Sequence, residues 1–223
     1  KHIFYNTPVQ AIKYNGDNVE VCSENEIWRA HKVIVAVPPN VTKDISFQPE
    51  LAGGRKHLQS EASFPPIVKS IFLYETPFWR EKNLNGSIYI DNGPILLTMD
   101  STPKDSDIGV LTVLVGGEKG RQYCEINKDT RKLDIIKALV RYLGEKADSP
   151  LHYYECNWTE EIRTKGGYGS HFAPGILTKY GEHLSAPVGP IHWAGTETAR
   201  EWRLYMEGAL ESGERAAQEI IAA

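Results

Sequence analysis

The sequence has few cysteines, no basic run and no long apolar run, and each shortage excludes a class of protein. Cys22, Cys124 and Cys156 are widely spaced and odd in number, so they form neither a disulfide framework nor a metal-binding pattern. No apolar run approaches the ~20 residues that a membrane helix needs, so we expect no membrane segment and a cytoplasmic location. A net charge of −4 without a basic cluster indicates no nucleic-acid partner.

The sequence also lacks the glycine pattern that opens dinucleotide-binding domains. No G-x-G-x-x-G follows a predicted strand in the 223 residues. In Rossmann-type folds this pattern holds the pyrophosphate of the cofactor. The first residues, Lys1-His2-Ile3-Phe4, read as the middle of a strand. We therefore expect that the N-terminal dinucleotide-binding βαβ unit is missing and that the chain is the C-terminal half of a longer protein.

The residues that are present suit a globular fold with a sizeable core, because 41% of them are hydrophobic. Asn15-Gly16 lies between two alternating runs and predicts a hairpin, and the apolar run 33–37 predicts a buried strand. Asn127 is the predicted N-cap of a helix over 131–143, with Leu133 on its buried face, and Gly144 ends that helix. Further strands, expected to form an antiparallel sheet, are predicted at 67–74, 87–90, 95–98, 110–115 and 151–158.

The most informative stretch is Ile191-His192-Trp193-Ala194-Gly195-Thr196-Glu197-Thr198-Ala199, followed by Tyr205-Met206-Glu207-Gly208 and a helix. It predicts a short buried strand, a glycine turn and a helix whose small and apolar residues, Leu210 among them, share one face. A free helix N-terminus can bind an anion or an electron-rich ring edge. On spacing alone an ordinary strand–loop–helix connection is the better explanation, because short glycine motifs have many false positives.

The exact amino acids of this stretch are more specific than the spacing of its glycine and apolar residues. AGTETA followed by YMEGA-x-E-x-GERAA closely resembles the C-terminal flavin-binding segment of the flavin-containing amine oxidases, those of the monoamine oxidase type in particular. Four further segments occur earlier in the chain, in the order found in this family: VIVAVPP, PPIVKSIFLYETPFWR, NWTEE and FAPGILTKYG. The resemblance implies a mixed α+β and α/β fold. Residues 1–58 and 161–223 would belong to a Rossmann-like FAD-binding domain of the glutathione-reductase type, and 59–160 would form an antiparallel-sheet substrate domain with helices.

The same resemblance implies an FAD-dependent amine oxidase, which converts a small amine and oxygen to an aldehyde, ammonia and hydrogen peroxide. Lys69 matches the family's active-site lysine, although a single lysine in an apolar strand usually lies on an exposed face. Tyr168 and Tyr205 match the two tyrosines of the aromatic cage, whose ring faces guide the amine to the flavin. Without the resemblance each tyrosine would be read as structural.

Five further residues match the family's cofactor contacts. The Val9 backbone would touch the adenine, Trp158 would pack near the flavin ring, and the Met206 N–H would reach flavin O2. Gly195 and Thr196 would follow the ribityl–phosphate path. Because the pyrophosphate site lies in the expected missing half, tight FAD binding is expected only when that half is present.

The chain departs from monoamine oxidase at two places. Gly167 stands where that enzyme has the cysteine bonded to the flavin, so we predict FAD bound without a covalent link. Arg203-Leu204 stands where that enzyme has a small pair ending in glycine, which leaves the substrate open. A polyamine or L-amino-acid oxidase and a folded, non-catalytic fragment or scaffold remain alternatives, and a homodimer is left open.

Overall fold

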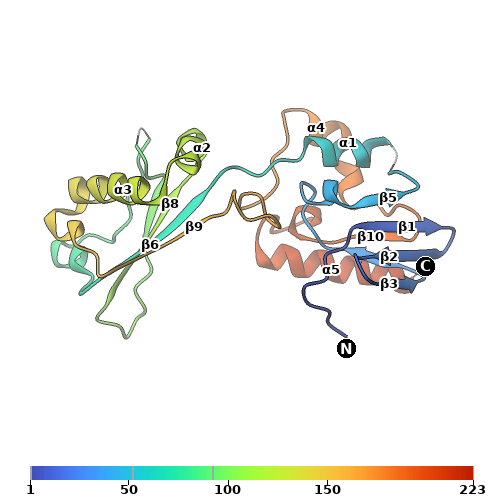
Figure 1. The fold of residues 1–223 in the computed structure, drawn as a ribbon, viewed down its shortest axis with the longest axis horizontal. Coiled ribbons are helices and arrows are strands. Elements are labelled where there is room, and N and C mark those ends of the chain that lie inside the picture. Colours follow the sequence, from blue (N-terminus) through green and yellow to red (C-terminus); the bar gives the residue numbers. More distant parts are fainter. Residues whose placement is uncertain (1, 52, 92, 223) are drawn as a thin grey trace. The chain divides into compact units, whose positions relative to one another are not determined.

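The chain divides into two compact units in the structure, a computed structural model that describes residues 2–51, 53–91 and 93–222. Residues 1–64 and 168–223 form unit 1, and residues 65–167 form unit 2 (Figure 1). The sequence places domain boundaries after residues 58 and 160, and the compact units end after residues 64 and 167. The functional roles predicted for these segments stay predictions.

Unit 1 contains a four-stranded sheet in the order β3-β2-β1-β5. The predicted hairpin is present, and Gly16 turns it with φ +58°, a conformation that favours glycine. The short strand β5 was not predicted, and it pairs parallel with β1. The strands of this sheet are β1 (Ala11–Asn15), β2 (Asn18–Cys22), β3 (Ile27–Ala30) and β5 (Ser46–Gln48).

A second, two-stranded parallel sheet in unit 1 pairs β4 (Val33–Val35) with β10 (Ile191–Trp193), which are far apart in the sequence. Strand β10 is buried at all three residues. Its Ile191 and Trp193 belong to a core cluster with Ile12, Val19 and Phe47. The buried strand predicted before the glycine turn is therefore confirmed.

Helices cover the strands of unit 1. The long helix α5 (Met206–Ile221) is packed against β10, while α1 (Gly53–Glu61) and α4 (Ile176–Tyr180) lie against each other, with the rings of His57 and Tyr180 4.6 Å apart (Figure 1). Short 3-10 turns complete the unit: η1 (Thr42–Asp44), η4 (Gly181–Leu184) and η5 (Thr196–Thr198).

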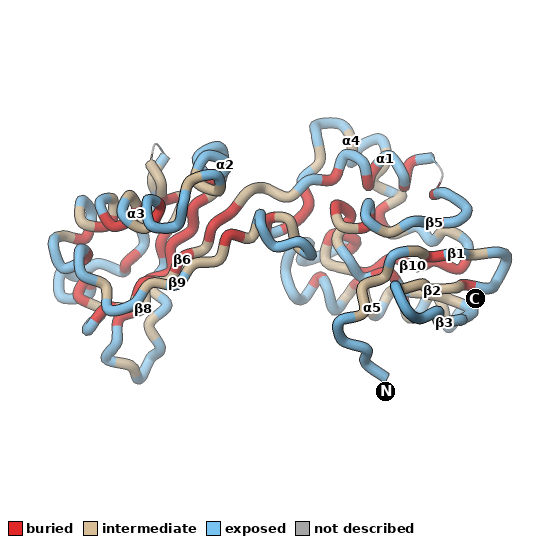
Figure 2. The backbone as a smooth tube through the Cα atoms, viewed as in Figure 1, coloured by how far each residue is buried: buried red, intermediate tan, exposed pale blue. Residues whose placement is uncertain are grey.

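Unit 2 is built on the predicted antiparallel sheet. Its strands lie in the order β7-β8-β6-β9. Burial alternates along β6: Val68, Ser70, Phe72 and Tyr74 are buried, and the residues between them, Lys69 included, are half-buried (Figure 2). Alternation of this kind places successive side chains on opposite faces of a sheet. The strands are β6 (Val68–Tyr74), β7 (Leu97–Asp100), β8 (Gly109–Val115) and β9 (His152–Asn157).

Helix α3 (Lys128–Leu143) packs on the buried face of this sheet through Ile135, Ile136 and Leu139. Its predicted ends are confirmed. The Asn127 side chain accepts a hydrogen bond from the Thr130 N–H at 2.9 Å, and Gly144 follows the last turn with φ +100°. The other helical elements are α2 (Gly117–Glu125), which was not predicted, η2 (Phe78–Lys82) and η3 (Glu145–Asp148).

Four sequence predictions are wrong. The apolar run 33–37 was predicted as a buried strand, but the strand ends at Val35, and Ile34 and Val37 are 39% and 36% exposed. Residues 87–90 form no strand, because the Ile88 N–H donates to the Thr98 side-chain oxygen at 2.8 Å instead of to a strand backbone. Leu133 is 56% exposed, since α3 buries the neighbouring face that carries Ile135. Leu210 is 65% exposed on α5, whose buried stripe consists of small residues, Gly208, Ser212 and Ala216.

Candidate functional site

The predicted site residues fall into both units. Unit 1 contains Val9, Tyr168, Gly195, Thr196, Tyr205 and Met206, and unit 2 contains Lys69 and Trp158. Each group is described within its own unit.

The Val9 backbone is free to contact a ligand. Hydrogen bonding of the adjoining sheet begins one residue later, where the Gln10 N–H donates to the Cys22 carbonyl at 2.8 Å. Within the described part of the chain, the N–H and C=O of Val9 have no hydrogen-bond partner. The Val9 side chain packs on the core cluster of unit 1. Val9 therefore packs on the core through its side chain, and contact of its backbone with a ligand stays a prediction.

Two aromatic residues that the sequence did not indicate stand beside Val9. The rings of Phe4 and Trp28 are 5.4 Å apart, and together with Thr7 and Val9 they line a hollow of about 210 Å³. Aromatic faces are suitable partners for a flat base. The signal that could have found them is weak, because it consists only of two aromatic residues placed just before β1 and within β3.

The glycine turn joins β10 to α5. Gly195 has φ +105°, a conformation that favours glycine, and a Cβ placed there would make only ordinary contacts, the nearest at 3.8 Å. The Gly195 N–H donates to Ser212 Oγ at 3.0 Å, and its carbonyl accepts from Thr198 Oγ1 at 2.8 Å. Thr196 Oγ1 donates to the Tyr205 carbonyl at 2.8 Å. The turn and the start of the helix are therefore tied together.

The start of α5 presents free donors. Tyr205 is the N-cap residue, in an extended conformation and without a side-chain cap. Among the described residues no acceptor is found for the N–H groups of Met206 and Glu207, and Met206 is 87% exposed. The first N–H groups of a helix carry its partial positive charge and attract electron-rich groups.

The two predicted cage tyrosines are both exposed, Tyr168 by 60% and Tyr205 by 66%. The Tyr205 ring meets the Trp202 ring edge-on, with centroids 6.1 Å apart. Partial burial raises the pKa of the Tyr168 hydroxyl, so this phenol stays neutral at physiological pH.

A buried carboxylate links the Tyr168 segment to the glycine turn. Glu197 is 4% exposed, and its Oε1 accepts from the N–H and the Oγ of Ser170 at 3.3 and 3.4 Å. Sequence reasoning missed this role, because an acidic residue in a turn is normally solvated. The link places the backbone next to Tyr168 on the same turn that holds Tyr205.

In unit 2, Lys69 lies on β6 opposite Cys156 of β9 and Leu114 of β8. Trp158 follows β9; its N–H donates to the Ile67 carbonyl at 3.1 Å. The indole Nε1 of Trp158 is buried and has no partner among the described residues. A buried donor without a partner is rare in a complete protein, so this side chain has the capacity for one more acceptor.

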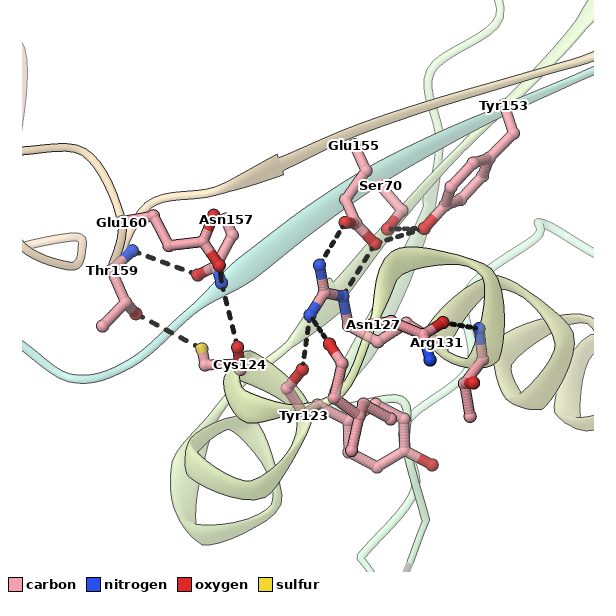
Figure 3. A network of polar contacts seen from close by, with 12 residues as sticks. Ser70, Tyr123, Cys124, Asn127, Arg131, Tyr153, Glu155, Asn157, Thr159 and Glu160 are labelled. Carbon is pink, nitrogen blue, oxygen red and sulfur yellow. Dashed lines mark hydrogen bonds and ion pairs between the residues drawn. The ribbon is translucent and has the colours of Figure 1, made fainter.

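A buried polar network joins helix α3 to strands β6 and β9 (Figure 3). The Arg131 guanidinium forms a bidentate pair with Glu155 at 3.1 and 2.7 Å, with both side chains at least 94% buried. Tyr153 bonds both Glu155 and Ser70, which is the neighbour of Lys69 on β6. The hydrogen bonds that Arg131 donates to Glu155 raise the pKa of its guanidinium above the usual value. Removal of either partner would leave a buried charge uncompensated.

The turn around Trp158 is held in the same region. Asn157 Nδ2 donates to Glu160 Oε1 at 2.7 Å and to the Cys124 carbonyl at 3.3 Å, and Asn157 Oδ1 accepts from the Thr159 N–H at 3.2 Å (Figure 3). Cys124 Sγ lies 3.3 Å from Thr159 Oγ1. The backbone on both sides of Trp158 is therefore fixed.

Comparison with known proteins shows the family of the chain. The profile of a family described as "Flavin containing amine oxidoreductase" matches residues 1–221. The chain belongs to this family. The flavin-containing amine oxidase of Oncorhynchus mykiss is 42% identical over 96% of the chain, and flavin-containing amine oxidase A of Sus scrofa is 39% identical over the same share. The chain spans 42% and 41% of their respective lengths.

Solved structures of the family show the same fold. A putrescine oxidase, wild type bound to putrescine, has a TM-score of 0.93 at 36% identity, covering 99% of this chain and 49% of its own. Cyclohexylamine oxidase from Brevibacterium oxydans IH-35A has a TM-score of 0.90 at 29% identity, covering 96% and 47%. The predicted family and its flavin cofactor are confirmed, and the chain spans about half the length of these relatives.

The residues present fit a flavin nucleotide. Val9 offers unpaired backbone groups, Gly195 has no side chain and a positive φ that allow close approach to its backbone, and the start of α5 offers free N–H groups. All three lie in unit 1. Gly167 carries no thiol, and a Cβ there would lie 3.1 Å from Ile67 Cγ2, which is closer than ordinary packing.

No helix in the described part of the chain is long and apolar enough to cross a membrane.

Proposed function

We propose that this chain is the C-terminal portion of an FAD-dependent amine oxidase that deaminates a small amine to an aldehyde, with release of ammonia and hydrogen peroxide. The observation that carries the proposal is the combination of a family match over residues 1–221 with the glycine turn and unpaired helix start in unit 1. Bound FAD would supply the redox chemistry, taking up the electrons of the amine and passing them to oxygen.

The residues of the chain would bind and orient. The Val9 backbone would contact the adenine, with Phe4 and Trp28 as further candidates beside it. Gly195 and Thr196 would follow the ribityl–phosphate path. Met206 would donate its N–H to the carbonyl edge of the flavin ring, and Trp158 would pack near that ring.

Two tyrosines and one lysine would act on the reacting groups. Tyr168 and Tyr205 would face the amine from two sides and orient its dipole toward the flavin. Lys69 would hold a proton or a water near flavin N5 and assist the reaction with oxygen. Their expected roles rest on the match of each position to the family, and Lys69 lies on the less buried face of β6.

Attachment and substrate are proposed as follows. FAD would be bound without a covalent bond, because Gly167 stands at the linking position and the three cysteines, all free thiols, lie elsewhere. The expected products, an aldehyde and ammonia, imply a primary amine as substrate, and a polyamine or L-amino-acid oxidase remains the alternative within the superfamily. A non-catalytic fragment or scaffold is the alternative outside it. The cytoplasmic location and a homodimer stay predictions.

The experiment is to express the full-length protein and measure products. A yellow preparation that forms aldehyde and hydrogen peroxide in equal amounts from an amine supports the proposal. A colourless protein that stays colourless with added FAD supports the scaffold alternative. The isolated chain is expected to bind FAD weakly, since relatives are about twice as long.

A further inference from the structure

Two residues near the tyrosines interlock. If Gly169 carried a Cβ, that atom would lie 2.2 Å from Leu204 Cδ2 and 3.0 Å from Leu204 Cγ. Real Cβ atoms essentially never lie closer than 3.0 Å to another heavy atom, so an alanine at position 169 would force the Leu204 side chain to move. The contact lies entirely within unit 1.

Leu204 is held in an unfavourable backbone conformation. Its φ is +71°, in the left-handed region that residues with a β-carbon rarely adopt, and Trp202 two residues earlier has φ +50°. A strained residue persists when its surroundings over-determine it, and such residues gather at functional sites. The strain is an observation that a simple surface loop does not explain.

The interlocked residues are the immediate neighbours of the two predicted cage tyrosines. Gly169 follows Tyr168, and Leu204 precedes Tyr205. The backbones on both sides are already bound to one turn, through Ser170 to Glu197 and through the Tyr205 carbonyl to Thr196. The Leu204 side chain fills the remaining gap between the two segments.

We propose that Leu204 and Gly169 are a positioning pair that sets the separation of Tyr168 and Tyr205. The inference rests on the proposed function, since it assigns the pair an effect on amine oxidation. Neither residue is required to touch the substrate. A change in the gap would shift one ring relative to the other, and a misplacement of about 1 Å can cost a reaction about 100-fold in rate.

The test is a double-mutant cycle in the full-length holoenzyme with Gly169→Ala, Leu204→Gly and the two combined. Gly213→Ala on α5 is the matched control, because a methyl there meets nothing within 4 Å. Three quantities are measured: FAD content, the denaturant midpoint of unfolding, and the limiting rate of flavin reduction by a saturating amine.

We expect Gly169→Ala to retain FAD, to lower the unfolding midpoint and to slow limiting flavin reduction about 10- to 100-fold. Leu204→Gly alone removes the side chain that fills the gap, so it should also slow flavin reduction, although glycine suits φ +71°. In the double variant the methyl added at position 169 has no Leu204 side chain to displace, so the loss of rate should be smaller than the two single losses combined. Gly213→Ala should leave the rate of flavin reduction unchanged and should not lower the midpoint, because alanine is favoured over glycine inside a helix.

The two substitutions could have coupled effects on the unfolding midpoint while every variant reduces its flavin as fast as the wild type. That result would show a packing contact only and would overturn the inference. Free-energy losses in rate that simply add in the double variant would show that the two residues do not act as a pair and would also overturn it. If no amine reduces the flavin of the wild-type protein, the proposed function fails, and the inference fails with it. This failure is distinguishable from a failure of the inference alone, because it is seen in the wild type before any variant is measured.

Discussion

The N–H of Gly195 donates a hydrogen bond to Ser212 Oγ, 3.0 Å away, and so joins the glycine turn to helix α5. Ser212 is fully buried and donates in turn to the Ala209 carbonyl at 2.8 Å. Small residues on the covered stripe of α5 allow this close approach: a Cβ at Gly208 would lie 2.3 Å from the Trp202 carbonyl oxygen. The bond therefore fixes where the free end of the helix points.

Replacing Ser212 by alanine should destabilise the protein. The Gly195 N–H would lose its acceptor, and a buried donor left without a partner costs about 1–3 kcal/mol. Denaturant unfolding of the full-length protein measures the loss. Ser60→Ala, which removes one exposed hydrogen bond to the His57 carbonyl, should stay within about 0.5 kcal/mol. Equal effects of the two changes would contradict the assigned role of Ser212.

Replacing Met206 by proline should lower the reduction potential of the bound flavin. Proline is tolerated in the first turn of a helix but has no N–H to donate. A helix N-terminus stabilises a nearby anion by ~0.3–1 kcal/mol, and up to ~2 when partly buried. Since ~30 mV in a two-electron couple is ~1.4 kcal/mol, we expect a fall of at most tens of millivolts. An unchanged potential in a folded, flavin-loaded variant would mean that α5 serves packing alone.

Replacing Lys69 by methionine should separate the two half-reactions. The change keeps length and apolar bulk but removes the charge and the donors, so reduction by amine should stay similar while reaction with oxygen slows about tenfold or more. Stopped-flow absorbance follows each half-reaction. Lys13→Met, an exposed strand lysine, is the control. Unaffected reoxidation would make Lys69 a structural residue.

FAD should leave the protein on denaturation. Gly167 provides no thiol for a bond to the flavin, so acid precipitation of the full-length holoenzyme should release the yellow colour into the supernatant. Flavin that stays with the pellet, or a fluorescent protein band after denaturing electrophoresis, would show a covalent link from another residue.

Asp100 should make unit 2 more stable above pH 4 than below pH 2. Burial acts to raise its pKa, but hydrogen bonds from Arg80, Trp79 and Thr102 outweigh it and lower the pKa to about 2. A carboxylate whose pKa is lower in the folded than in the unfolded protein adds to the stability of the folded state at pH values above the unfolded pKa. This added stability is lost as the pH falls from 3.8 to about 2.

Asp100→Asn should therefore cost about 2 kcal/mol of unfolding free energy at pH 7 and little at the acid end of that range. Asp105→Asn, at an exposed carboxylate, is the control. A cost for Asp100→Asn that does not change with pH would assign the effect to lost geometry instead of charge.

Local signals predicted most of the fold. The Asn15-Gly16 turn, the Asn127 cap and the buried strand before Gly195 depend on neighbours in the sequence, and all three are present. The failures have long-range causes. The Thr98 side chain replaces a ladder acceptor for Ile88, and β5 exists because β1 offers it an edge.

The candidate site could be predicted only from sequence segments that resemble those of a known family. Nothing in the periodicity of the chain separates Tyr168 or Lys69 from ordinary exposed and half-buried residues, and the family match selects them. The buried Glu197 and the interlock of Leu204 with Gly169 depend on which segments meet in space. Spacing along the chain contains no information on such contacts.

The central claim is that the assembled protein moves electrons from an amine to its flavin. The most direct test is anaerobic titration of the full-length, FAD-loaded protein with a primary alkyl amine, followed by flavin absorbance. The account predicts stoichiometric bleaching of the flavin band, and its return when oxygen is admitted. A flavin band that no primary amine, polyamine or amino acid bleaches, in a folded and fully loaded protein, would contradict it.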